Sequence, residues 1–253
     1  MKLERHIKIV DLLSKQRAIK NEELMEKFNI SIETVRRDLK FLEHEGCLRR
    51  VYGGAVANIN LGSEPEYDNR LQIHNKAKTA IASAAAELIQ PNDTIFMGVG
   101  TTVEAMVPFM KNFGKTTVFT NALRTAAQLS KIPDCTVILP GGMLRPNELT
   151  LSGFPSEDNL ANFNVDKAFI GIGGITEAGV TDFHIGEAQL HRTVIKNAQK
   201  TIILADSDKL GVRAMNNVCS FDDIAYIITD SGAPKQIIKM FERAGVKVII
   251  AQD

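Results

Sequence analysis

The sequence predicts an α/β protein in two parts: a helical head that ends in a hairpin, over residues 1–57, and a larger domain on a parallel sheet, over residues 76–253. Three observations predict this organisation. The head shows three helical patterns followed by a Gly-Gly pair. Farther along the chain, uniformly apolar segments alternate with helical ones, which is typical of parallel strands covered on both faces. Finally, 253 residues that are 44% hydrophobic suffice for two cores.

The composition argues against a membrane-spanning, secreted or zinc-binding protein. No apolar run approaches the roughly 18 residues that a membrane-spanning helix needs, and the amphipathic start does not resemble a secretory signal. We therefore expect no membrane partner. The three cysteines, Cys47, Cys135 and Cys219, are scattered and lack C-x-x-C spacing. This argues against a disulfide framework and against a zinc site, and it indicates the cytoplasm.

The head begins with two helical segments joined by a short connector. Apolar residues recur at helical spacing over residues 3–15. Residues 17–20 are expected to be extended, and Asn21 is predicted to cap a second helix over residues 22–28, whose first turn is acidic. Asn29-Ile30 then forms the turn into a third helix.

The third helix carries the residues that indicate a function. Ser31 is predicted to cap it, and it is expected to end at Gly46. Four apolar residues form a buried stripe: Ile32, Val35, Leu39 and Leu42. The opposite side carries Thr34, Arg37 and Lys40, with Arg36 on its flank. Arginine can read guanine edges, and Thr or Ser suits phosphate or base contacts. Taken alone, a surface helix with solvated arginines is equally common, but the preceding helix and turn favour a DNA-binding helix-turn-helix.

A basic hairpin is predicted directly after this helix. Leu48–Val51 and Val56 mark two short extended pieces around Gly53-Gly54. Such a hairpin is a wing, and Arg49 and Arg50 would reach phosphates or the minor groove. An edge hairpin with solvated arginines remains the alternative. Residues 1–57 hold 12 Lys and Arg against 9 Asp and Glu, whereas the rest holds 18 against 21. The sign of this asymmetry fits a basic head that binds nucleic acid.

Residues 58–75 are polar and rich in Asn, Gly and Ser, which predicts an interdomain linker. An alanine-rich helix is expected over residues 78–89. The expected strands cover residues 94–99, 117–119, 136–139, 167–172, 201–205, 225–228 and 246–250, and the expected helices between them cover residues 103–110, 123–129, 186–198 and 234–244. In such sheets ligands bind at the carboxyl ends of the strands.

Several of these strand ends carry residues suited to an anionic or hydroxylated ligand. Gly100-Thr101-Thr102 offers hydroxyls and a backbone that can approach a phosphate, although it lacks the ending of a Walker A loop. A turn with a helix cap is the more common meaning of such a triplet in isolation. The other candidates are small, amide or charged residues: Thr120, Asn121, Gly141, Gly142, Arg145, Asp182, Glu187 and Lys209. His184 and His191 are interpreted as surface histidines.

Residues 1–57 resemble the winged-helix reader of the DeoR family of bacterial transcription regulators. The matching residues are Ser31-x-x-Thr34-Val35-Arg36-Arg37-Asp38-Leu39-x-x-Leu42-Glu43-x-x-Gly46-x-Leu48-x-Arg50 and Val51-Tyr52-Gly53-Gly54-Ala55. Tyr52 departs from the family, which often has His there. The larger domain resembles the family's sensor domain in Ala80-Ile81-Ala82, Ala86-x-Leu88-Ile89, Gly100-Thr101-Thr102, Thr120-Asn121, Gly141-Gly142 and Leu204-Ala205-Asp206-Ser207-x-Lys209. That domain is similar to ribose-5-phosphate isomerase and CoA-transferase folds.

The resemblance implies a DNA-binding regulator, most often a repressor of a carbohydrate operon, with a phosphorylated sugar or a sugar-derived metabolite as effector. Its partners would be double-stranded operator DNA and further copies of itself in a homodimer or homotetramer. The residues expected to contact DNA are Lys20, Ser31, Thr34, Arg36, Arg37, Lys40, Arg49, Arg50, Tyr52 and Gly53. The expected effector set is Gly98, Gly100, Thr101, Thr102, Thr120, Asn121, Gly141, Gly142, Arg145, Gly173, Asp182, Glu187 and Lys209. Family members commonly have Asp where this chain has Gly98.

Two other functions are compatible with the residues. The first is a sugar-phosphate isomerase with an added DNA-binding head, in which Asp182, Glu187 or Lys209 would move a proton. No convincing acid–base pair supports it, so no catalytic residue, cofactor or metal is predicted. The second is a protein-interaction module that uses the wing and Phe41, an aromatic residue on the polar side of the third helix.

Overall fold

The computed structural model describes residues 2–16, 18–44, 48–57, 64, 66–110 and 114–252 of the chain. It divides into two compact units, Met1–Ile73 and His74–Asp253. Each unit has its own hydrophobic core.

The first unit consists of three packed helices, a small antiparallel sheet and a further short helix. Its elements are α1 (Lys2–Gln16), β1 (Ala18–Lys20), α2 (Asn21–Phe28), α3 (Ile32–His44), β2 (Leu48–Val51), β3 (Gly54–Ala57) and α4 (Tyr67–Gln72). The strands pair in the order β1-β3-β2. The core joins the three helices to this sheet through Leu13, Leu24, Val35, Leu39 and Leu48. Three helices and a hairpin in this order form a winged helix-turn-helix, as predicted.

The start of α2 differs from the prediction. Asn21 is not the N-cap of α2: it is the first helical residue, the cap position belongs to Lys20, and no side chain bonds to the free amides there. The amide of Asn21 instead donates to the carbonyl of Gly53, 2.8 Å away. The expected end of α3 at Gly46 lies outside the described residues, as do residues 58–63 and 65 of the predicted linker; the described part of the linker includes α4.

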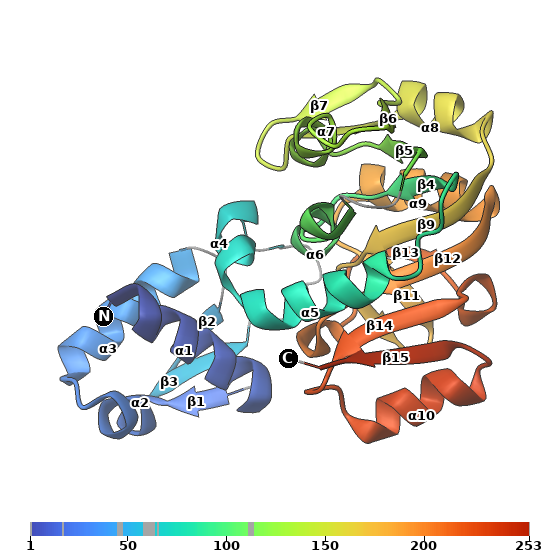
Figure 1. Cartoon of the computed structure of the whole chain (residues 1–253). Helices are drawn as coiled ribbons and strands as arrows, with labels where there is room; N and C mark the ends of the chain where they lie inside the picture. The colour runs from blue at the N-terminus through green and yellow to red at the C-terminus, as the bar shows by residue number, and fades with distance from the viewer. Residues whose placement is uncertain are drawn as a thin grey trace. The chain divides into compact units, whose positions relative to one another are not determined.

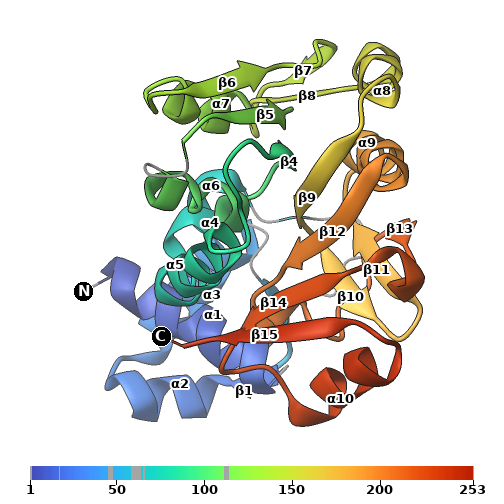
Figure 2. The ribbon, with the colours of Figure 1, turned by 45° about the vertical axis from the view of Figure 1, so that its right-hand side comes forward.

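The second unit is built on seven parallel strands in the order β15-β14-β12-β9-β4-β5-β6. Figure 2 shows them running from β15 at the bottom to β6 at the top. Their bounds are β4 (Thr94–Met97), β5 (Thr116–Thr120), β6 (Cys135–Ile138), β9 (Val165–Gly171), β12 (Ala198–Leu204), β14 (Tyr226–Asp230) and β15 (Lys247–Ala251). Every strand predicted from an apolar segment is present, with ends that shift by a few residues.

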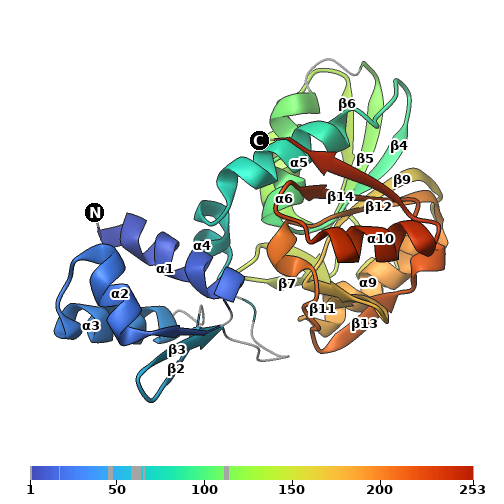
Figure 3. The same cartoon turned by 90° about the horizontal axis from the view of Figure 1, so that it is seen from below.

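Helices cover both faces of this sheet, which explains why the strands are mainly apolar. On one face lie α5 (Asn75–Ala86), α6 (Thr101–Glu104), the 3₁₀ turn η1 (Val107–Met110) and α7 (Leu123–Leu129). On the other lie α8 (Phe154–Ala161), α9 (Ile185–Lys196) and α10 (Lys235–Arg243). Figure 3 shows α5 and α10 on opposite sides of the strands. The single helix predicted over residues 103–110 is instead α6 followed by η1.

Two small sheets were not predicted. They are the hairpin β7 (Met143–Arg145) with β8 (Thr150–Ser152), and the antiparallel sheet of β10 (Gly174–Thr176), β11 (Gly179–Asp182) and β13 (Asn216–Cys219). The remaining 3₁₀ turns are η2 (Ser207–Lys209) and η3 (Phe221–Asp223). Figure 1 shows the β7 hairpin beside β6 and α8. Among the described helices, none is both long enough and apolar enough to cross a bilayer.

Candidate nucleic-acid interface and effector site

The third helix of the head, α3, presents its basic side to solvent. Ser31 caps it as predicted, because the amide of Thr34 donates to the Ser31 hydroxyl at 3.3 Å. Arg36, Arg37 and Lys40 are exposed, whereas Val35 and Leu39 are buried. The guanidinium and ammonium groups are therefore available on one side of a helix whose other side forms the core.

The buried side of α3 also holds a carboxylate whose role sequence reasoning missed. Asp38 is fully buried, accepts a hydrogen bond from Nε of Arg5 at 2.7 Å, and lies 3.0 Å from Nε2 of His6. Burial alone would raise the pKa of Asp38, but the hydrogen bonds from Arg5 and His6 lower it overall. A charged residue on the margin of an apolar stripe was the available signal for this anchor.

The hairpin β2–β3 is the wing, and it projects from the helices of its unit (Figure 3). Arg49 and Tyr52 are exposed, and Gly53 turns the chain with φ at +83°. Gly54 is required for a different reason, because a side chain there would collide with the carbonyl of Ile19 on β1. Lys20, also exposed, lies opposite Gly54 on the same small sheet.

Arg50 is held within the head. Its amide donates to Oε1 of Glu43 at 2.8 Å, and its Nε donates to Oε2 of the same carboxylate at 2.7 Å. Phe41 also has an intramolecular partner: its half-exposed ring stacks on His6 with centroids 4.9 Å apart.

The predicted effector residues of the second unit follow the carboxyl ends of the central strands. Gly100, with φ at +144°, precedes α6, and Thr101 and Thr102 are buried in its first turn. The next strand, β5, ends at Thr120, and Asn121 follows; both are fully buried. The Thr120 hydroxyl accepts a bond from the amide of Ala122 at 3.2 Å and so shapes this turn.

A buried carboxylate joins three of these segments. Glu187, in the first turn of α9, is 1% exposed and accepts bonds from Asn121 Nδ2 at 2.8 Å and Thr150 Oγ1 at 2.6 Å. Nη1 of Arg145 lies 3.9 Å from Glu187, and its Nη2 lies 3.6 Å from Glu148. Both carboxylate oxygens of Glu187 therefore bind protein groups, and Arg145 is held between two acidic residues.

Three buried oxygens at strand ends have no hydrogen-bond partner among the described residues: Asn121 Oδ1, Asp206 Oδ1 and Thr229 Oγ1. Asn121 follows β5, Asp206 follows β12, and Thr229 is the penultimate residue of β14. Buried polar atoms in native proteins are rarely left without a partner, because desolvation then goes uncompensated. Their position at the carboxyl ends of three strands of one sheet makes that edge of the sheet a candidate ligand site.

The remaining predicted effector residues have contacts within the second unit. The Gly141 carbonyl accepts a hydrogen bond from Ser156 of α8, and a side chain at Gly142 would collide with the same serine. Gly173 similarly makes room for Phe183 and Asp182. Nearby, Oδ1 of Asp182 accepts a bond from the amide of His184 at 3.1 Å, and Nζ of Lys209 lies 5.8 Å from the centre of the Phe183 ring.

The prediction that His191 is a surface histidine is wrong. Its ring is fully buried, neither ring nitrogen has a hydrogen-bond partner in the described structure, and burial lowers its pKa to about 4. Its Nε2 would lie 2.9 Å from a Cβ placed on Gly98. The position where family members commonly carry Asp is thus occupied here by a glycine that adjoins a neutral imidazole.

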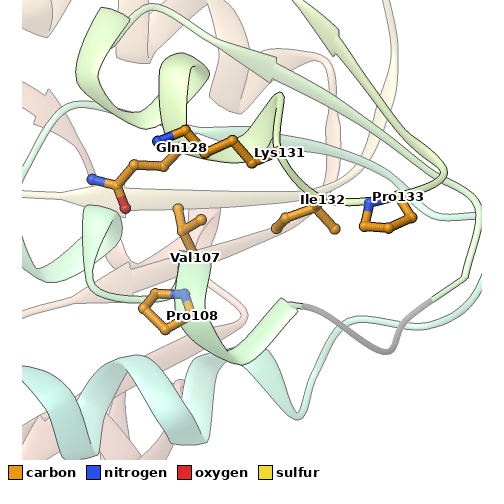
Figure 4. A pocket seen from close by; sticks show the side chains of 6 residues that line it. All are labelled: Val107, Pro108, Gln128, Lys131, Ile132 and Pro133. Carbon is orange, nitrogen blue, oxygen red and sulfur yellow. The ribbon is translucent and has the colours of Figure 1, made fainter.

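A pocket of about 460 Å³ lies elsewhere in the second unit. Figure 4 shows its lining: Val107, Pro108, Gln128, Lys131, Ile132 and Pro133. Ile132 and Pro133 lead into the amino end of β6. The pocket is therefore at the opposite end of the strands from the loops described above. Within the described ranges, no group of three His, Cys, Asp or Glu side chains is placed to hold a metal ion.

Comparisons with known proteins agree over the whole chain. A DeoR-like helix-turn-helix domain matches residues 5–60, and the DeoR C-terminal sensor domain matches residues 73–231. The regulator GolR of Listeria innocua is 36% identical over 98% of each chain. The transcriptional repressor GlcR of Bacillus subtilis is 31% identical over 98% of this chain and 96% of its own. The glycerol-3-phosphate regulon repressor of Escherichia coli is 31% identical over 94% of each.

Among solved structures, a ribose 5-phosphate isomerase from Methanocaldococcus jannaschii aligns with 54% of this chain and 54% of its own, at 17% identity and a TM-score of 0.41. A likeness this distant carries no argument about function.

Proposed function

Because the chain belongs to the DeoR family of DNA-binding transcriptional regulators, we propose that it represses a carbohydrate-utilisation operon and is released from its operator by a phosphorylated sugar. The named relatives are regulators and repressors, so the protein is a regulator and the isomerase hypothesis is rejected. The proposal therefore concerns which residues contact DNA, which ligand is sensed, and how the two are linked.

On the DNA side, the proposed base-reading residues are Arg36 and Arg37, with Thr34 and Lys40 beside them. Their exposure on a helix anchored from behind by Asp38 supports this assignment. Arg49, Tyr52 and Gly53 of the wing, together with Lys20, Ser31 and Arg50, are proposed to meet the sugar-phosphate backbone. A single head makes few base contacts, so we propose a two-fold homodimer or a homotetramer acting on a symmetric operator.

On the effector side, the proposal is carried by the unpartnered oxygens at the strand ends. Asn121 Oδ1 and Asp206 Oδ1 accept hydrogen bonds, so a ligand there must supply donors, as sugar hydroxyls do. Lys209, Arg145 and the backbone around Gly100 are the proposed groups for its phosphate. Gly98, Thr101, Thr102 and Thr120, Gly141 and Gly142, Gly173, Asp182 and Glu187 complete the proposed site, several of them by shaping its walls.

The spacing between strands gives an estimate of the length of a ligand that would reach both Asn121 and Asp206. Asn121 and Asp206 follow strands β5 and β12, between which lie β4 and β9. Three spacings of about 4.8 Å separate the two residues by roughly 14 Å. Subtracting a hydrogen bond of about 3 Å at each end leaves roughly 8 Å for the ligand. That length suits a small phosphorylated sugar bound across Gly98 and Gly100, which follow β4, and Gly171, which ends β9. The name of the Escherichia coli relative also refers to a phosphorylated metabolite.

The ligand must bind one arrangement of the paired heads better than the other, since equal affinity would shift nothing. Because the chromosome is the target, we propose the cytoplasm as the compartment.

The test combines two measurements on the full chain. A duplex bound by the wild-type protein is first enriched from a random pool. Phosphorylated sugars and their unphosphorylated counterparts are then compared for a rise in melting temperature and for release of that duplex. We expect one phosphorylated class to do both. If only unphosphorylated sugars act, or if no sugar changes either readout, the effector proposal is wrong.

A further inference from the structure

The contact between Glu43 and Arg50 connects helix α3 to the wing. Glu43 lies in the last turn of α3, and Arg50 lies on β2, the strand at the edge of the order β1-β3-β2. An edge strand has backbone amides that no neighbouring strand accepts. Glu43 accepts one of them, the amide of Arg50, and with its other oxygen accepts the Nε–H of the same residue. One carboxylate therefore fixes both the strand and its side chain.

This geometry leaves the outer part of the guanidinium available. An arginine has five N–H donors, of which Glu43 takes only the one on Nε. The Arg50 side chain is 43% exposed and that of Glu43 is 34% exposed, so the pair stays in contact with solvent. Successive residues of a strand point to opposite faces, so Arg49 and Arg50 serve different faces of the wing. The hydrogen bonds from Arg50 lower the pKa of Glu43, which is therefore a carboxylate at neutral pH.

We propose that Glu43 is a positioning residue for DNA binding: it holds the wing at a fixed place beside α3 and directs the Nη groups of Arg50 toward a backbone phosphate. Arg50 contacts the DNA, and Glu43 acts through Arg50. A guanidinium restrained in this way binds phosphate with less loss of conformational entropy than a mobile one.

Whether removing the Glu43 carboxylate weakens or strengthens DNA binding distinguishes a positioning role from simple charge repulsion. Removing a carboxylate from a DNA-binding surface reduces repulsion with the phosphates and should strengthen binding. A positioning role predicts the reverse, because the freed arginine and wing lose their fixed geometry. Glu26, an exposed carboxylate on α2 for which the described residues provide no hydrogen bond or ion pair, supplies the matched control.

The experiment measures the affinity of the full chain for its enriched duplex at several salt concentrations, with melting curves to check that each variant is folded. We expect Glu43→Ala to raise the dissociation constant about 3- to 10-fold, and Glu43→Gln, which can still accept the Arg50 amide, to raise it less. Glu26→Gln should leave it unchanged or lower it. Arg50→Ala should reduce the salt slope by about 1, as expected for the loss of one phosphate contact.

A double-mutant cycle completes the test. In an Arg50→Ala background, Glu43→Ala should change affinity less than about 2-fold, because only the contact with the backbone amide of residue 50 remains to be lost. The proposal is overturned if Glu43→Ala binds as tightly as wild type or more tightly. It is also overturned if Glu43→Ala weakens the Arg50→Ala protein as much as it weakens the wild type. Because Glu43→Gln retains the backbone contact, it provides the same test if the alanine variant does not fold.

Discussion

Nε of Arg5 donates a 2.7 Å hydrogen bond to Oδ2 of Asp38, which ties the first helix of the chain to the middle of the reading helix. Nε2 of His6 lies 3.0 Å from the other oxygen of the same carboxylate. Asp38 thus follows two exposed arginines and precedes the exposed Lys40 in the sequence, and it fixes the helix from its buried side. We therefore expect DNA binding by α3 to depend on Asp38, although this buried side chain would not itself contact DNA.

Replacing Asp38 with alanine should lower the stability of the head. Arg5 would lose its partner in a largely buried setting, a change that costs about 3 kcal/mol in typical proteins. Native-state hydrogen exchange of the α3 amides measures this local free energy of opening. Lys40→Ala, at an exposed position of the same helix, should change it by less than about 0.5 kcal/mol. Equal protection in Asp38→Ala and wild type would show that the anchor contributes no stability.

Stability should fall as the solution is acidified below pH 6.5, because of His191. In the folded protein its pKa is about 4, below the ordinary value of 6.5, since burial disfavours the charged ring. Between these values the unfolded chain binds a proton that the folded chain does not, so acid favours unfolding. The loss should reach about 3 kcal/mol by pH 4. Asp38, whose pKa is lowered, loses its contribution only at still lower pH.

Urea denaturation of the full chain at several pH values, followed by a signal from the second unit, measures this loss. His191→Met removes the titrating group and should flatten the dependence between pH 6.5 and 4. If the variant loses stability as steeply as the wild type, another group is responsible.

Arg37→Ala should weaken operator binding by about 1–3 kcal/mol if the guanidinium reads a base edge. Affinity for a random duplex should then change much less, because phosphate contacts are independent of sequence. Competition between the enriched duplex and random DNA measures the difference. Equal losses on both would make Arg37 a phosphate contact.

Replacing Thr101 and Thr102 together with valine should abolish the metabolite response and leave operator binding intact. Valine keeps the shape of these buried side chains and removes only their hydroxyls. The melting-temperature shift and duplex release by the active sugar phosphate provide the readout. A normal response would place the phosphate in another part of the sheet edge.

The sequence allowed the reading helix, the wing and all seven parallel strands to be predicted, because each depends on local periodicity or on an apolar run. It did not reveal contacts between distant segments. Glu187 accepts hydrogen bonds from Asn121, 66 positions away in the sequence, and from Thr150, 37 positions away. No local sequence pattern indicates these contacts. The β7 hairpin and the antiparallel sheet of β10, β11 and β13 consist of strands of three or four residues, too short for a periodic signal.

Glycines are a second reason why the sequence alone did not fix the residues of the candidate site. Gly141 and Gly142 were predicted to approach a ligand, and the fold gives each a packing role as well: the Gly141 carbonyl accepts a hydrogen bond from Ser156 of α8, and Gly142 makes room for the same serine. The same residue type serves either purpose, and only the neighbouring segment decides which.

The close approach of Gly98 to the His191 ring constrains how this regulator can diverge. Any side chain at position 98 would meet Nε2 at 2.9 Å, so that position cannot enlarge while the imidazole keeps its place. The two sites, 93 residues apart in the chain, should therefore mutate as a pair, and relatives with an acidic residue at the first are expected to carry a different side chain at the second.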